Sequence, residues 1–188
     1  MKKLFLSLCF ISTLSLVACN NNAGATKTTY EDFYNKTQEI EDYHHSEATL
    51  TITYFSDFIQ GEEVIKENRT RTYKYTWNTE ANMFAPVEEY DSDFANEISK
   101  TAKELYANKP QDSEDNINMG YEYYINPFKV YVDYTETIES RTIRSIESFT
   151  YDKYGFLTNY LLQVEAEGTY KDQPISGMQK IAYSVSYK

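Results

Sequence analysis

Apolar and polar residues alternate with a period of two along much of this chain, and this pattern limits the folds open to it. Between residues 48 and 54, Ala, Leu, Ile and Tyr alternate with three threonines. Successive side chains of a strand point to opposite faces of a sheet, so this stretch predicts a strand with one buried face. We expect five further strands, over residues 64–78, 121–134, 137–151, 156–167 and 180–187. The strand over residues 121–134 should be broken at Asn126-Pro127.

Two stretches have helical spacing instead. Thr29 is a suitable N-cap, and the apolar residues from Tyr30 to Ile40 recur on one side of a helix. A second helix begins near residues 91–93 and ends before Asn108-Lys109-Pro110. The order of elements predicts an α+β fold, in which two helices pack on one face of a curved antiparallel sheet of about six strands.

Cysteine usage excludes several ways of stabilising this fold. The chain has two cysteines, Cys9 and Cys19, both within the first 19 residues. A domain formed by the remaining residues has no disulfide, no catalytic thiol and no cysteine-rich metal site. Its stability must come from backbone pairing and an apolar core, for which 19 Tyr and 10 Phe supply large side chains.

The N-terminus has the pattern of an export signal. Lys2 and Lys3 precede an apolar run that ends in Leu16-Val17-Ala18-Cys19. These four residues resemble the lipobox of bacterial lipoproteins. The resemblance implies that residues 1–18 are a signal peptide removed on export. It also implies that Cys19 is the lipid attachment site, which anchors an acylated protein to the outer side of a bacterial membrane, at the cell surface or in the periplasm.

The rest of the chain divides simply. Residues 19–28 are small and polar, without hydrophobic period, which is typical of a flexible tether. Residues 29–188 are of a length suited to a single domain. The formal charge of the whole chain is −11, so we expect no nucleic acid partner, because an acidic surface repels the phosphate backbone.

No catalytic motif is found. The sequence lacks a Gly-x-Ser-x-Gly elbow, a glycine-rich phosphate loop and a His-Glu-x-x-His zinc motif. His44 and His45 are adjacent, so in a strand they would point to opposite faces and could not share a metal ion. We interpret the acidic runs at residues 88–93 and 112–115 as solvated charge. The prediction is a non-enzymatic protein without metal or cofactor.

One strand carries a candidate binding face. Between residues 64 and 78, one parity presents two arginines beside three large rings: Arg69, Arg71, Tyr73, Tyr75 and Trp77. Rings beside guanidinium groups can stack on a ligand or partner. The alternative is that the rings belong to the core and the arginines extend from its rim.

These observations favour a membrane-anchored module that binds an unknown protein or hydrophobic ligand. Helices lying against a long, aromatic-rich sheet are similar to the half-barrel of LolA- and LppX-like lipoprotein carriers, and this resemblance implies a hollow for acyl chains. A filled core without a hollow is the alternative, and a cystatin-like arrangement with a protein partner is another. An envelope enzyme is a further reading, for which no specific residue argues.

Overall fold

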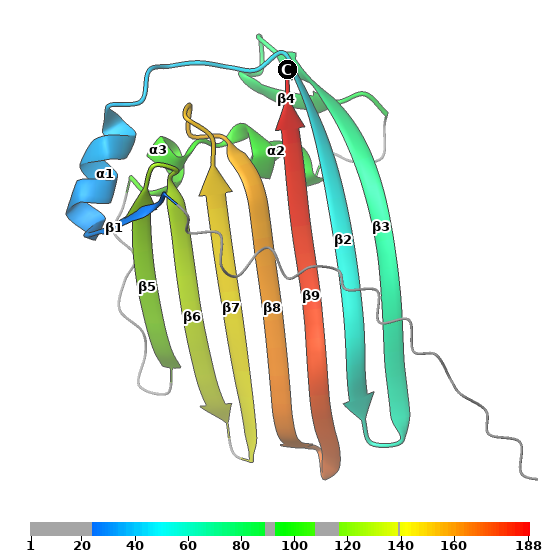
Figure 1. Ribbon diagram of the computed structural model, residues 1–188. Helices are drawn as coiled ribbons and strands as arrows, with labels where there is room; N and C mark the ends of the chain where they lie inside the picture. Colours follow the sequence, from blue (N-terminus) through cyan, green and yellow to red (C-terminus); the bar gives the residue numbers. More distant parts are fainter. Residues whose placement is uncertain (1–23, 89–92, 108–116, 139) are drawn as a thin grey trace, which may run out of the picture.

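The computed structural model describes residues 24–88, 93–107, 117–138 and 140–188. Within them the chain forms nine strands and three short helices (Figure 1). The strands are β1 (Thr26–Thr28), β2 (Glu47–Gln60), β3 (Glu63–Asn78), β4 (Met83–Pro86), β5 (Ile117–Ile125), β6 (Lys129–Ile138), β7 (Arg141–Tyr151), β8 (Leu157–Tyr170) and β9 (Gln173–Tyr187). The helices are α1 (Tyr30–Gln38), α2 (Asp93–Ser99) and α3 (Ala102–Leu105). None of the helices in these ranges is long and apolar enough to cross a membrane.

All nine strands form one antiparallel sheet, in the order β1-β5-β6-β7-β8-β9-β2-β3-β4. From β5 to β9 each strand pairs with the next one along the chain, through short turns. The last strand, β9, also pairs with β2, so the two halves of the sequence meet in the middle of the sheet. The alternating pattern of residues 48–54 therefore lies in a central strand.

The expected α+β fold, with about six strands and two helices, was wrong, because the protein is mostly β. The stretch 121–134 is divided at Asn126-Pro127 into β5 and β6, and the short strands β1 and β4 extend the two edges. The predicted second helix is divided into α2 and α3. Between them, the backbone of Thr101 bridges to Phe156, and the Thr101 side chain caps α3. Three residues of the predicted tether, Thr26–Thr28, form β1.

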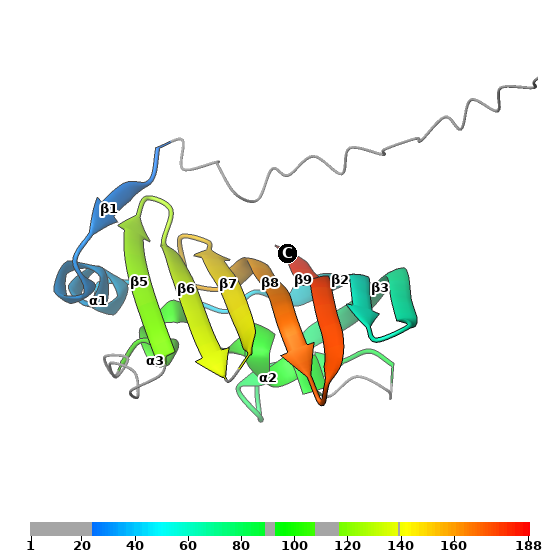
Figure 2. The ribbon, with the colours of Figure 1, turned by 90° about the horizontal axis from the view of Figure 1, so that it is seen from below.

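The helices lie on one face of the sheet, which we call the helix-bearing face; the other is the bare face. They cover only the end of the sheet at which β2 begins and β9 ends (Figure 1). We call this the covered end. The turns β2–β3, β6–β7 and β8–β9 lie at the open end, beyond the helices. Figure 2 shows α1 beside the β5 edge, α3 beneath the strands next to it and α2 beneath the middle of the sheet.

One buried side chain from each helix fixes it to the sheet. Phe33 of α1, Ile98 of α2 and Ala102 of α3 have no exposed surface. Phe33 lies in a cluster with Tyr123 and Val130, Ile98 in a larger one that includes Leu50, Tyr75 and Phe84, and Ala102 in a third with Tyr151 and Leu157. A hydrogen bond of 3.1 Å between the hydroxyl groups of Tyr106 and Tyr151 adds a polar link between the residue after α3 and β7.

Candidate functional site

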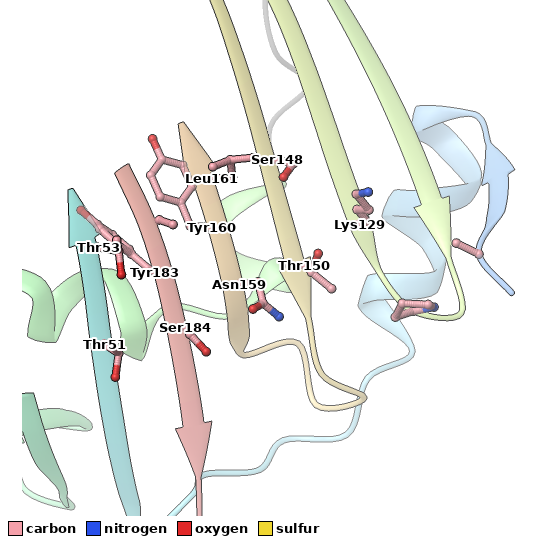
Figure 3. A pocket seen from close by; sticks show the side chains of 13 residues that line it. Thr51, Thr53, Lys129, Ser148, Thr150, Asn159, Tyr160, Leu161, Tyr183 and Ser184 are labelled. Carbon is pink, nitrogen blue, oxygen red and sulfur yellow. The ribbon is translucent and has the colours of Figure 1, made fainter. Parts of the chain in front are cut away.

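A polar hollow of about 450 Å³ lies on the bare face (Figure 3). Six of its lining residues are short hydroxyl or amide side chains from four neighbouring strands: Thr51, Thr53, Ser148, Thr150, Asn159 and Ser184. Beside the hollow, two threonines of β2 pair with threonines of β3: the hydroxyl oxygens of Thr51 and Thr72, and those of Thr53 and Thr70, are each 3.3 Å apart. Polar residues are the ordinary content of a sheet face that meets water. The hollow by itself therefore does not indicate a ligand.

The predicted binding face on β3 is divided by the helices. Tyr75 is buried in the core beneath α2, and Tyr73 stacks on Phe94 of that helix at 5.8 Å between ring centroids. Trp77 stacks on His44 at 5.2 Å. The five residues therefore do not form one continuous exposed surface.

The two arginines of this set lie beyond the helix and are exposed. The Arg69 guanidinium lies over the Tyr54 ring, 5.0 Å from its centroid, and pairs with Glu67 at 3.2 Å. Arg71 lies one row nearer the covered end, opposite Ile52.

The two histidines have separate surroundings. His44 stacks on Trp77, whereas His45 bonds through Nε2 to the Asp152 carboxylate at 2.7 Å and stacks on Tyr187. Among the residues that the structure describes, no group of three His, Cys, Asp or Glu side chains could hold a metal ion. Of the two acidic runs, residues 112–115 and most of 88–93 lie outside the described ranges.

The helix-bearing face stays largely apolar beyond the helices. The strand register gives three successive rows towards the open end. The first is Tyr54, Ile181, Leu162, Glu147, Val132 and Tyr121; the second is Ser56, Gln179, Val164, Ser145, Tyr134 and Met119; the third is Phe58, Gly177, Ala166, Ile143 and Glu136. Apart from Val132 and Tyr121, these side chains belong to none of the three clusters that pack on the helices.

We call the apolar part of these rows the open apolar face: Tyr54, Phe58, Tyr134, Ile143, Leu162, Val164, Ala166 and Ile181. These side chains are half-buried by their neighbours in the sheet. The corresponding rows of the bare face contain Lys180, Gln163, Asp133, Glu165 and Arg144. The helix-bearing face is thus more apolar than the bare face over its whole length, including the part near the open end. A sheet face that only meets water would be polar, so the open apolar face calls for another explanation.

A groove of about 410 Å³ connects this face with the covered end. We call it the aromatic groove, and its lining residues are Tyr106, Met119, Tyr121, Val130, Val132, Tyr134, Ser145, Glu147 and Phe149. Its floor is formed by β5, β6 and β7, and Tyr106 closes it from the segment after α3. Burial raises the pKa of the Glu147 carboxyl above its usual range.

A second cavity, of about 250 Å³, adjoins the groove at Phe149 and lies between α2 and strands β7 to β9. Tyr160 and Tyr183 line it, with Glu97 and Lys100 at its mouth. Burial, assisted by the neighbouring Glu97 carboxylate, raises the pKa of Tyr183 to about 12. The hydroxyl groups of Tyr160 and Tyr183 are therefore neutral at any physiological pH and can take part in hydrogen bonds.

Sequence reasoning missed the aromatic groove because its residues come from three strands and a helix end. The irregular alternation over residues 137–151 contained a signal. Ile143, Phe149 and Tyr151 share one parity, and Glu147 has the same parity, so a carboxylate stands in an apolar row. The register between β7 and β8 shifts between Thr150 and Tyr151.

Comparison with known proteins adds no relative to this description. No family model matches the sequence, and no curated protein matches it.

Proposed function

We propose that this protein is a lipid-anchored protein of the bacterial envelope that binds a small hydrophobic ligand on the helix-bearing face of its sheet. One observation carries the proposal: the open apolar face has no covering helix among the described residues, although its bare counterpart is polar. Covering an aliphatic or aromatic side chain fully is worth about 1.5–3 kcal/mol, so a ligand placed there gains affinity from each residue that it shields.

The size of the aromatic groove favours a small ligand over a protein partner. Its volume, about 410 Å³, lies in the range of roughly 300–1,000 Å³ typical of small-molecule sites, and apolar and aromatic side chains dominate its lining. Because the groove opens onto the open apolar face, a long chain could extend from one into the other. This arrangement supports an acyl-chain ligand, as the likeness to LolA- and LppX-like carriers implies.

The anchor is tested by replacing the cysteine of the lipobox. Cys19→Ser should abolish incorporation of radiolabelled palmitate and block signal cleavage in a bacterial host. Cys9→Ser, which changes the other cysteine of the chain within the apolar run, is the matched control and should leave both unchanged. Labelling that persists in Cys19→Ser would overturn the anchor.

Binding is tested by extracting the full-length, host-processed protein from membranes and quantifying the lipids that remain with it by mass spectrometry. Leu161 and Leu162 are adjacent on β8 and point to opposite faces. Leu162→Gln, on the open apolar face, should reduce the co-purifying lipid several-fold, whereas Leu161→Gln, in the polar hollow, should not. Equal lipid in both variants and the wild type would contradict a site on the helix-bearing face.

A further inference from the structure

The aromatic groove has an unusual charge pattern for a site that holds an apolar chain. Glu147 is the only charged residue in its lining, and the remaining residues are apolar, aromatic or hydroxyl-bearing. Glu147 lies opposite Leu162 on one side and Val132 on the other. In the strand register, its carboxylate therefore stands in an apolar row.

No described residue neutralises this carboxylate. Among the described residues, no Lys, Arg or His forms an ion pair with Glu147, and no side chain donates a hydrogen bond to it. A half-buried carboxylate without a partner costs free energy, and proteins normally pair such a group. Burial is the main cause that raises the pKa of Tyr160, and the carboxylates of Glu147 and Glu97 both add to it, so a second negative charge lies nearby. A cation bound beside Glu147 would balance this charge.

The rings around Glu147 suit an organic cation better than a metal ion. The faces of tyrosine and phenylalanine rings attract ammonium groups, and sites for quaternary ammonium ligands combine such rings with a carboxylate. Phe149 is two residues from Glu147 on the same face of β7, and Tyr106, Tyr121 and Tyr134 complete the ring-lined wall. A metal ion would require further oxygen or nitrogen ligands, which this lining supplies only at Ser145 and the tyrosine hydroxyls.

We propose that the aromatic groove recognises an amine or quaternary ammonium group on its hydrophobic ligand, with Glu147 as the counter-ion and the surrounding rings as its cage. This inference rests on the proposed function, because it assigns the head group of the ligand that the open apolar face would hold. The net negative charge of the chain assists the approach of such a ligand.

Three amphiphiles with the same octyl chain separate the head group from the tail: octyltrimethylammonium, octyl glucoside and octyl sulfate. Each is titrated below its micelle-forming concentration into the processed, lipidated protein held in nanodiscs of digalactosyldiacylglycerol, a neutral lipid without an ammonium group. The methionine methyl groups provide a local NMR readout. Met119 lines the aromatic groove, Met83 packs on the core cluster of α2, and Met178 lies on the bare face. A Met119→Leu variant assigns the reporting signal.

The ammonium compound should shift the Met119 signal at a concentration about tenfold lower than octyl glucoside, with octyl sulfate weakest, as expected for a cation desolvated beside a carboxylate and rings. Glu147→Gln should remove that tenfold preference. Glu167→Gln, an exposed carboxylate on the bare face of β8, is the matched control and should leave the preference unchanged.

The outcomes separate the two proposals. Equal binding of the ammonium compound and octyl glucoside, unaffected by Glu147→Gln, would overturn the cation site and leave the proposed function standing. If none of the three compounds shifts Met119, the hydrophobic site itself is absent, and both proposals fail. A shift confined to Met178 places binding on the bare face and also overturns both.

Discussion

Gly177 of β9 stands directly opposite Phe58 of β2, and the two backbones approach so closely that no side chain fits between them. A Cβ placed on Gly177 would lie 2.6 Å from the Phe58 Cα and 2.3 Å from the Asp57 carbonyl oxygen. Gly177 also has a φ of 142°, which L-residues rarely adopt. The third row of the helix-bearing face is therefore interrupted by a glycine, and the paired strands β2 and β9 depend on it.

Gly177→Ala should destabilise the protein by about 2–4 kcal/mol, because the added methyl group meets backbone atoms, which cannot rotate away, and the conformation is strained. Gly120→Ala is the matched control. Gly120 lies in β5 with an ordinary φ, and its nearest contact would be 3.9 Å. Urea unfolding should show a loss for Gly177→Ala and no loss for Gly120→Ala. Equal stabilities would contradict the close approach of β2 and β9.

Two buried hydroxyl groups should respond differently to removal. Ser56 is 1% exposed, and its Oγ has no hydrogen-bond partner among the described residues, whereas the buried Thr37 Oγ1 donates to the Tyr34 carbonyl at 2.7 Å. Ser56→Ala should be neutral or stabilise the fold by about 1 kcal/mol, since a buried polar group without a partner carries a desolvation cost. Thr37→Val, which keeps the shape, should cost about 1 kcal/mol. Thermal unfolding compares them, and a larger loss for Ser56→Ala would refute the assignment.

Glu147 should destabilise the fold at neutral pH when no ligand is bound. Burial raises the pKa of its carboxyl, so the folded state holds the proton more tightly than the unfolded state. The stability that protonation gives is fully present below the unfolded-state pKa of about 4.3, and it is lost as the pH rises through the raised value. Glu147→Gln resembles the protonated form and should therefore raise the melting temperature at pH 7.

The difference in melting temperature between Glu147→Gln and the wild type should shrink as the pH falls and disappear near pH 4 or below. Glu167→Gln, on the bare face, provides the reference at each pH. A gain that does not vary with pH would show that the substitution acts through packing rather than through the charge of Glu147.

The free edge of β3 is protected by charge. β4 covers it only from Tyr75 to Asn78, and no other described strand pairs with that side of residues 63–74. Lys66, Arg69 and Arg71 lie along the uncovered length, and charged side chains oppose edge-to-edge pairing between molecules. Replacing all three with valine should convert the domain to higher oligomers in sedimentation velocity runs. Valine at Lys36, Lys153 and Lys188, which lie away from this edge, should leave the sedimentation profile of the domain the same as that of the wild type.

Period-two alternation was sufficient to place the long strands. Residues 48–54 and 64–78 lie within β2 and β3, and all but the first residue of 156–167 lies within β8, because alternation is a local property of each strand. The same local signals placed α1, where Thr29 caps the helix through a 3.1 Å bond from the Asp32 N–H. They failed for β1 and β4, which are too short to carry a pattern, and for the second helix, where the Thr101–Phe156 bridge is a long-range contact.

The sequence by itself determined most of the long strands, the acidic charge and the absence of a disulfide in the domain, since each follows from residue types and their spacing. Only the tertiary structure decided which part of the apolar face the helices cover. Arg69, Tyr75 and Trp77 share one parity in β3, yet Tyr75 is core and Arg69 is exposed, because Tyr75 packs in the cluster that contains Ala95 and Ile98 of α2 and Arg69 does not. The structure likewise brought Glu147 into an aromatic groove, since the rings around it come from segments that meet only when the sheet has formed.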